Sequence, residues 1–241
     1  MIRPHLNPLP EGEEAGFAAG ESGAFLFRSL IVYHDIDSRS AALNMAIDEV
    51  LLESATAPTI RFYRWDHPAL SFGYFGNFAD VAEYQYDRDI ARRWTGGGIV
   101  LHGEDLTYSI VIPASDTAFA ESPMSIYEKT HSAIKAALGA KAELASIAAP
   151  KISESCFANP VRADVLWNGQ KIAGAAQRKT RRGLLQQGSI QGIEFAADFD
   201  KSFTAELSDR SEEERLNGRI LERAQVIAGQ KYGTSAWLRR R

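Results

Sequence analysis

The apolar residues of this chain follow two periodicities, one typical of strands and one typical of helices. Strands are predicted where apolar residues alternate with polar ones or form short runs, at residues 25–33, 59–65, 69–75, 90–94, 99–101 and 107–112. Between the first two of these segments, apolar residues recur every three to four positions from Leu43 to Leu51. That spacing predicts a helix over residues 38–54, with a serine as its N-cap.

Two capping boxes predict further helices. Ser125 and Glu128 have the capping-box spacing, so we expect a helix that runs through Leu138 and ends near Gly139. A second box, Ser211-x-x-Glu214, predicts a last helix. The apolar face of that last helix would consist of Leu216, Ile220, Leu221, Ala224 and Ile227.

A hairpin signal lies between these two helices. Asn168-Gly169 separates the strand-like segments 164–167 and 170–176, and this dipeptide favours a type I′ turn because both central residues of that turn need positive φ. A third strand is predicted over residues 184–194. Strands and helices are mixed irregularly, and hairpins imply antiparallel pairing. We therefore expect an α+β fold with a mixed, mainly antiparallel sheet.

Composition and charge narrow the class of protein. The 241 residues are 45% hydrophobic and 24% charged, which is typical of a globular protein and allows one large domain. A formal net charge of −4 gives no reason to expect a nucleic-acid partner. No apolar run is long enough to cross a bilayer, so no membrane partner is expected. The single cysteine, Cys156, excludes an intramolecular disulfide, which favours a cytoplasmic protein.

The first residues differ in composition from the rest. Residues 1–24 are rich in Pro, Gly and Glu and contain no apolar segment typical of a signal peptide. We therefore predict a disordered tail over residues 1–24 and a single folded domain over residues 25–241.

Three consecutive glycines, Gly96, Gly97 and Gly98, form a possible ligand-binding loop. Such a run costs chain entropy, and it fits a place where the backbone turns sharply or approaches a ligand. It is neither a Walker loop nor a dinucleotide fingerprint, because no Gly-Lys-Ser/Thr follows and position 101 is leucine. A plain tight turn stays open as an alternative. Polar neighbours favour the ligand loop, namely Arg92, Arg93, His102 and Asp105.

The polar residues after this loop suggest two weaker sites. His102, Glu104 and Asp105 have only a generic spacing for metal ligands, so no metal is expected. Ser109 with His102 and Asp105 would form a hydrolase triad, but no nucleophile elbow surrounds this serine.

Lys171 and Cys156 are the candidate catalytic side chains. Lys171 follows the hairpin turn, and Ala173 to Ala176 after it are small, which leaves space for a ligand or a packed helix. Cys156 is either a small apolar filler beside Phe157 or a nucleophile whose pKa nearby cations lower.

Several motifs, in order, resemble the lipoate–protein ligase and octanoyltransferase family, whose catalytic fold is shared with biotin–protein ligases. The resemblance covers about residues 28–240. The motifs that carry it are LNMAIDEVLL (43–52), RFYRW..PALSFGY (61–74), RRWTGGGIVLH (92–102), DLTYS (105–109), GQKIAGAAQ (169–177) and QGS (187–189). It implies a mixed sheet flanked by helices and attachment of an octanoyl or lipoyl group to a lysine of a lipoyl domain.

The resemblance also implies roles for individual residues. Lys171 matches the family lysine. The expected substrate contacts are Arg93, Gly96, Gly97, Gly98, His102, Asp105, Tyr108, Asp164, Ala173 and Gly174. Two places depart from the family pattern. Ala163-Asp164 matches only in part the Asn-Asp or similar pair that is usual before the hairpin, and Gly76 stands where a Gln is common.

The family contains two reactions, and the cysteine position favours one. Ligases activate lipoate with ATP and Mg²⁺, whereas transferases carry octanoyl as a thioester on a cysteine and need no cofactor. One transferase type has its cysteine where this chain has Leu184, while another has a Cys-Phe pair that Cys156-Phe157 matches. The resemblance therefore implies transfer through Cys156. An ATP-dependent ligase and a non-catalytic lipoate- or lipoyl-domain-binding module stay open.

The implied partners follow from that reaction. Acyl carrier protein is the expected donor. The expected acceptors are lipoyl domains of 2-oxoacid dehydrogenase complexes or the glycine cleavage H protein.

Overall fold

The computed structural model describes residues 25–146 and 160–240, and a mixed sheet of eight strands is the centre of this described part. In spatial order the strands are β11 (Ser211–Glu214), β1 (Leu30–His34), β2 (Thr59–Tyr63), β6 (Leu106–Pro113), β10 (Gly183–Ile190), β9 (Gln170–Lys179), β8 (Val165–Trp167) and β7 (Ala142–Leu144). β1 pairs in parallel with β11 and β2, and every other neighbouring pair is antiparallel. The expected mixed, mainly antiparallel sheet is confirmed.

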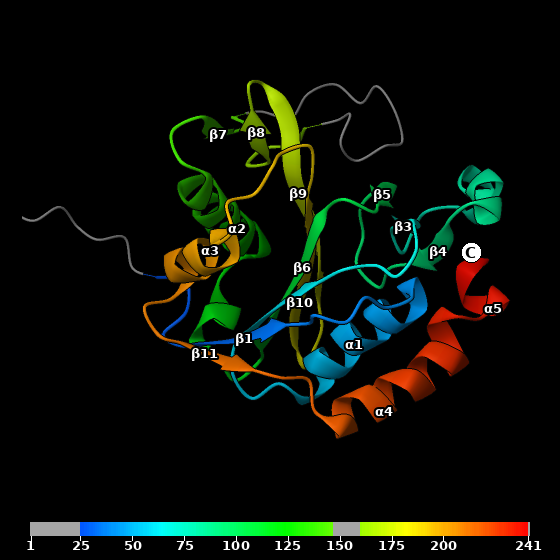
Figure 1. Ribbon diagram of the computed structural model, residues 1–241. Coiled ribbons are helices and arrows are strands. Elements are labelled where there is room, and N and C mark those ends of the chain that lie inside the picture. The colour runs from blue at the N-terminus through cyan, green and yellow to red at the C-terminus, as the bar shows by residue number, and fades with distance from the viewer. Residues whose placement is uncertain (1–24, 147–159, 241) are drawn as a thin grey trace, which may run out of the picture.

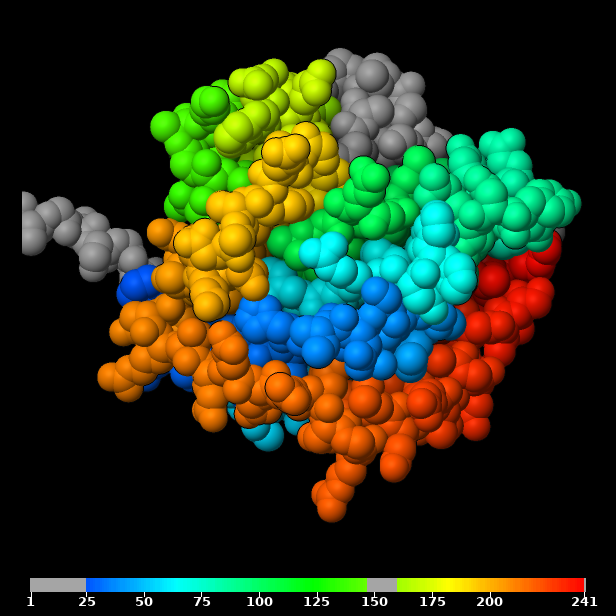
Figure 2. Space-filling model, in the orientation of Figure 1, coloured from blue at the N-terminus to red at the C-terminus, as the bar shows by residue number. Residues whose placement is uncertain are grey.

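Helices cover both faces of this sheet (Figure 1). They are α1 (Ala41–Ser54), α2 (Pro123–Leu138), α3 (Phe199–Leu207), α4 (Gly218–Ile227) and the short α5 (Ser235–Leu238). One apolar core lies between the sheet and α2 with α3, and a second lies between the sheet and α1 with α4. Figure 2 shows the segment of α4 and α5 lying along the α1 side of the molecule. Both cores sit against β6 and β10, which are buried on both faces.

A smaller sheet carries the glycine run. Its strands are β4 (Asp89–Arg92), β3 (Ala69–Phe72) and β5 (Val100–His102), in that order. The run Gly96–Gly98 connects the outer strands β4 and β5 and lies over the end of β3. Short 3-10 helices accompany this region, η1 (Phe78–Asp80) and η2 (Ala82–Tyr86) before β4, and η3 (Thr117–Ala120) precedes α2. A π-helical turn, η5 (Ala228–Tyr232), follows α4.

The hairpin prediction is confirmed at its turn. Asn168 and Gly169 have φ of 52° and 76°, as a type I′ turn between β8 and β9 requires. The helix predicted over 38–54 is also present as α1, and Ser40 caps it by accepting a hydrogen bond from the amide of Leu43.

The first predicted capping box is wrong. α2 begins at Pro123, and its N-cap is Ser122, whose hydroxyl accepts from the Ser125 amide at 3.1 Å. Proline fits the first helical position because no partner exists there for an amide hydrogen. Ser125 instead donates its hydroxyl to Glu121 at 2.6 Å. The predicted end near Gly139 is confirmed, with φ of 85° at that residue.

The second predicted capping box is also wrong. Ser211–Glu214 forms β11, an exposed strand that pairs in parallel with β1. The helix begins four residues later, where the Asn217 side chain accepts a hydrogen bond from the amide of Ile220 at 3.0 Å. The backbone of β1 needs a partner at this edge of the sheet, and that requirement overrides a local capping pattern.

Other predicted boundaries shift because tertiary contacts end the elements. The segment predicted as a strand from residue 25 becomes one only at Leu30. The strand predicted to reach residue 75 ends at Phe72, because Gly73 packs directly against the glycine run. The strand predicted to reach residue 194 ends at Ile190, shortly before Gly192 turns with φ of 72°. β7 and α3 had no prediction.

A buried charged group fastens α1 to the sheet. The Arg61 side chain is fully buried and lies between two carboxylates, at 2.7 Å from Asp35 and 3.0 Å from Asp48. Asn44 accepts a further hydrogen bond from Arg61 at 2.6 Å. Burying a charge is costly unless it is paired and hydrogen-bonded, so these contacts must all be present together.

We expect Arg61→Leu to lower the free energy of unfolding by about 3–5 kcal/mol, because it leaves two buried carboxylates without their shared cation. Urea unfolding at neutral pH measures the loss. Arg64→Leu, at a neighbouring exposed position, is the matched control and should change stability little. A loss below about 1 kcal/mol for Arg61→Leu would show that the network does not hold α1 in place.

Candidate functional site

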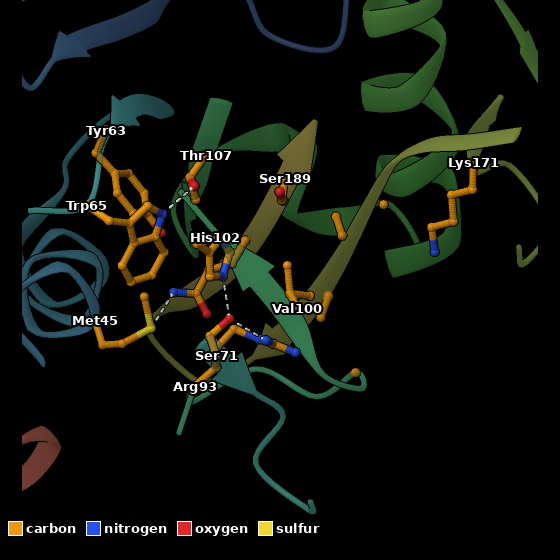
Figure 3. A pocket seen from close by; sticks show the side chains of 16 residues that line it. Met45, Tyr63, Trp65, Ser71, Arg93, Val100, His102, Thr107, Lys171 and Ser189 are labelled. Carbon is orange, nitrogen blue, oxygen red and sulfur yellow. Dashed lines mark hydrogen bonds between the residues drawn. The ribbon is translucent and has the colours of Figure 1, made fainter. Parts of the chain in front are cut away.

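A pocket lies between the two sheets (Figure 3). Its empty space is about 490 Å³, counting the solvent at its mouth. In Figure 3, Lys171 lies across the pocket from Met45, Tyr63 and Trp65. The pocket therefore has an apolar, aromatic end and an end that carries a cation.

The apolar end is closed and the glycine side is open. Met45 from α1 and Tyr63 from β2 are both 2% exposed. Gly97 is exposed, and Val100 and Gly174 are half-buried. A ligand that enters along the glycine run would therefore place its apolar part against the closed end and its polar part near Lys171.

The glycine run is held in place by its own neighbours. The Arg93 guanidinium donates hydrogen bonds to the carbonyls of Gly96, at 3.0 Å, and Gly98, at 2.8 Å. A Cβ at Gly73 would lie 2.0 Å from the Gly97 carbonyl oxygen, so only glycine allows this approach. Gly97 itself has φ of 88°, a conformation that glycine adopts readily.

Asp105 organises the wall of the pocket. Its carboxylate accepts hydrogen bonds at 2.7 Å from the hydroxyls of Thr107 and Ser189 and from His102 Nδ1. Trp65 in turn donates its indole N–H to Thr107 at 2.8 Å and stacks on His102 with ring centroids 4.2 Å apart. One buried carboxylate thus fixes the side chains along this wall.

The protonation of His102 follows from its partners. Burial lowers the pKa of His102, and the hydrogen bond to Asp105 offsets only part of that effect, so the ring is neutral. Because a carboxylate only accepts, Nδ1 carries the proton, and Nε2 accepts from the Ser71 hydroxyl at 2.7 Å. Ser71 in turn accepts from Arg93 at 2.7 Å, which links Asp105 to the glycine run.

An irregularity in β9 directs Lys171 into the pocket. Val165 opposes Ala173, but the next residue, Leu166, opposes Lys171, so Ile172 is an extra residue on β9. Residues 171 and 174 would point to opposite faces of a regular strand, and one extra residue brings them to the same face. Accordingly, a Cβ at Gly174 would lie 2.7 Å from Lys171 Cε.

Lys171 is paired with a buried carboxylate. Its Nζ lies 2.8 Å from Asp164 Oδ2, and the two side chains are 5% and 0% exposed. Asp164 ends the turn before β8, and its Oδ2 also accepts from the Val161 amide at 2.6 Å. The ion pair holds the lysine side chain over Gly174.

The structure brings some of the predicted site residues together and leaves others outside the pocket. The predicted residues that line the pocket are Arg93, Gly97, His102, Lys171 and Gly174. Gly96, Gly98, Asp105 and Asp164 contact these residues from behind. Tyr108 and Ala173 face the core beside α2 and α3 and are not part of the lining. Cys156 lies outside the described residues.

Several lining residues were not assigned to the site from the sequence, although they lie within the motifs that carry the family resemblance. They are Met45, Tyr63, Trp65, Ser71, Gln187 and Ser189, which arrive from α1, β2, β3, β10 and the turn after β2. Ser71 occupies the place beside His102 that the triad hypothesis gave to Ser109, whose hydroxyl donates to Asp48 instead. Only the pairing of β3 with β5 brings Ser71 there.

The described residues contain neither a cluster of metal ligands nor a membrane-spanning helix. Within residues 25–146 and 160–240, no group of three His, Cys, Asp or Glu side chains is placed to hold a metal ion. In the same residues, no helix has both the length and the apolar character that crossing a bilayer requires.

The pH dependence of stability reports on Asp105. Burial alone would raise the pKa of Asp105, but hydrogen bonds from His102, Ser189 and Thr107 lower it to about 2. The stabilisation is therefore present above the unfolded-state pKa of about 3.9 and is lost as the pH falls to about 2.

We expect Asp105→Asn to remove about 2 kcal/mol of pH-dependent stability over that window. Unfolding by urea at a series of acidic pH values measures it, with Glu104→Gln, at an exposed neighbouring position, as the control. An unchanged slope of stability against pH would contradict the role given to Asp105.

Sequence comparisons identify relatives of this chain. The family profile described as "Lipoyl protein ligase A/B catalytic domain" matches residues 40–214. Octanoyltransferase LipM of Oceanobacillus iheyensis is 35% identical over 204 residues, which are 78% of this chain and 73% of that protein. Octanoyltransferase LipM of Bacillus subtilis is 34% identical over 175 residues, 65% of this chain and 63% of that protein.

Solved structures share the fold. A lipoate-protein ligase A bound with ATP superposes with a TM-score of 0.66 at 21% identity, covering 88% of this chain and 98% of that chain. A bipartite lipoate protein ligase of Thermoplasma acidophilum, described with its E2 lipoyl domain, gives a TM-score of 0.64 at 21% identity, with coverage of 88% and 95%. With three-quarters of its sequence matched by one family profile and this fold shared, the chain belongs to the lipoyl protein ligase A/B catalytic domain family.

Proposed function

We propose that this protein transfers an octanoyl group from a carrier protein to a lysine of a lipoyl domain. The observation that carries the proposal is the shape of the pocket, with a closed apolar end at Met45 and Tyr63 and Lys171 across from it. An eight-carbon chain would bury its tail at the closed end and place its carbonyl beside the lysine. The octanoyltransferase relatives support the same reaction.

Lys171 would stabilise charge on the reacting carbonyl. A tetrahedral intermediate of acyl transfer carries a negative oxygen, and a cation held in a nearly dry site stabilises it strongly. The Lys171 side chain is 5% exposed, and its pairing with Asp164 holds it in one direction. A preorganised cation of this kind lowers the barrier because it need not reorient during the reaction.

Cys156 is the proposed nucleophile. Its thiolate would attack the octanoyl carbonyl, form a thioester and release the carrier thiolate, which takes up a proton. The amine of the acceptor lysine would then attack that thioester, form the amide, lose a proton and release the Cys156 thiolate. This assignment rests on the Cys-Phe pair in the sequence.

The proposal implies particular partners and needs no cofactor. Acyl carrier protein is the proposed donor. The proposed acceptors are the lipoyl domains of 2-oxoacid dehydrogenase complexes or the glycine cleavage H protein. An ATP-dependent ligase would instead need ATP and Mg²⁺ with lipoate, and a binding module would transfer nothing, so a single assay separates the three.

The assay follows the mass of an apo lipoyl domain during incubation with the protein. Octanoyl-carrier protein should give an octanoylated domain without ATP, and Lys171→Ala should lower the rate by 10²-fold or more. Cys156→Ser should abolish transfer and the enzyme adduct. Modification only with lipoate, ATP and Mg²⁺ would identify a ligase. No modification under either condition would contradict both reactions.

Gly174 offers a finer test. A Cβ there would lie 2.7 Å from Lys171 Cε and 2.8 Å from Nζ, and the flexible end of the lysine can move away. We expect Gly174→Ala to lower kcat about tenfold or more by displacing the amine, with little change in melting temperature. Gly103→Ala is the matched control, because a Cβ there would meet no atom. Gly192→Ala, in a turn remote from the pocket lining, cannot serve as the control, because φ at Gly192 is 72° and a side chain there would strain the backbone. Full activity of Gly174→Ala would contradict the placement of Lys171.

A further inference from the structure

The turn that presents Asp164 is strained. Ala163 has φ of 68°, the left-handed region that residues other than glycine rarely adopt. The turn closes through a hydrogen bond from the Asp164 amide to the Val161 carbonyl at 3.0 Å. Strain of this kind persists only where surrounding contacts hold it. Ala145 holds the backbone of this turn, because its carbonyl accepts from the Ala163 amide at 2.8 Å and its amide donates to the Asp164 carbonyl at 2.9 Å. Further contacts come from side chains of α2.

Tyr127 on α2 forms a hydrogen bond with Asp164 at the end of the turn. Its hydroxyl lies 2.5 Å from Asp164 Oδ1 and also accepts a hydrogen bond from the Ala175 amide at 3.3 Å. Because the Asp164 carboxylate only accepts, the phenol must donate to it. Burial, followed by the charge of Asp164, raises the pKa of Tyr127, so its proton stays in place for this bond.

His131, one helical turn further along α2, forms a hydrogen bond with the strained residue, Ala163. Its Nδ1 lies 2.7 Å from the Ala163 carbonyl and donates to it. Burial lowers the pKa of His131 to about 4, so the ring is neutral and has one N–H to give. The Tyr127 and His131 rings are also in edge contact, with centroids 4.1 Å apart.

The two oxygens of the Asp164 carboxylate have different partners. Oδ1 is taken by Tyr127, while Oδ2 receives the Val161 amide and lies 2.8 Å from Lys171 Nζ. A carboxylate free to rotate would present either oxygen to the lysine. With Oδ1 held by Tyr127 and Oδ2 held by the Val161 amide, the carboxylate has one orientation, and the direction of Lys171 follows from it.

We propose that Tyr127 and His131 are positioning residues for Lys171, acting through the turn that carries Asp164. The inference rests on the proposed function, because Lys171 is taken there as the group that stabilises the reacting carbonyl. Neither residue lines the pocket, so neither touches the acyl group. Their effect should therefore appear in the rate of the chemical step and not in binding of the acyl chain.

Tyr127→Phe removes the hydroxyl and keeps the ring. We expect kcat of octanoyl transfer to fall about tenfold or more, with KM for octanoyl-carrier protein within about twofold of wild type. Glu128→Gln is the matched control, because Glu128 contacts Arg162 of the same turn through an exposed ion pair at 2.7 Å. It should leave kcat unchanged. Full kcat in Tyr127→Phe would overturn the proposal.

His131 gives an independent pair of variants. His131→Asn can return a donor near the position of Nδ1, whereas His131→Leu cannot. We expect kcat to be lost in His131→Leu and largely recovered in His131→Asn. Equal losses in both variants, with melting temperatures equal to wild type, would also overturn the proposal.

A readout that needs no activity separates this inference from the proposed function. Acetylation of Lys171 by acetic anhydride, followed by mass spectrometry of its peptide, measures how tightly the amine is held. We expect labelling several-fold faster in Tyr127→Phe than in wild type or Glu128→Gln. Faster labelling in a protein that transfers no octanoyl would leave the positioning intact and refute the function. Unchanged labelling in Tyr127→Phe, together with octanoyl transfer by the wild-type enzyme, would refute the positioning role and leave the proposed function intact.

Discussion

One surplus residue in β9 decides which face of the sheet Lys171 joins. On a regular strand Lys171 would point toward α2, into the apolar core that Ile172 and Ala173 occupy. The extra residue places Ile172 and Ala173 together in that core and sends the lysine to the pocket face. The absence of a side chain on Gly174 then gives the lysine room to lie along the strand. The position of the Lys171 amine in the pocket thus depends on the register of the β9 backbone.

Buried carboxylates hold the other parts of the site, and each is fully used. Asp48 accepts hydrogen bonds from Arg61 and Ser109. Asp105 accepts hydrogen bonds from the side chains of the pocket wall. Asp164 pairs with Lys171 and accepts a hydrogen bond from Tyr127. A buried charge is tolerated only with such complete pairing, and complete pairing also removes conformational freedom. The same arrangement that avoids a desolvation penalty therefore makes the pocket rigid before a ligand enters.

Local signals in the sequence predicted part of this structure well. The Asn168-Gly169 turn, the helix after Ser40 and the end of α2 at Gly139 each depend on one or two neighbouring residues. Ser211 shows the limit of such signals, since its capping pattern predicts the start of a helix but the segment forms a strand that pairs with β1. The sheet class was predictable because hairpins are local, whereas the order of the strands was not.

The candidate site was predictable only where its residues are close in sequence. The glycine run and His102 with Asp105 lie within ten residues, and Lys171 follows a recognisable turn. Ser71 and Tyr127 lie far from their partners along the chain, and no spacing rule connects them. Tyr108 was expected near the substrate, yet strand alternation places it on the core face beside Phe203.

The most direct measurement of the central claim is a crystal structure of the protein with a bound octanoyl group. We predict that the hydrocarbon tail lies against Met45, Tyr63 and Trp65, and that the carbonyl oxygen lies within hydrogen-bond distance of Lys171 Nζ. An octanoyl chain that binds outside this pocket, or in the reverse direction with its carbonyl at the closed end, would contradict the account.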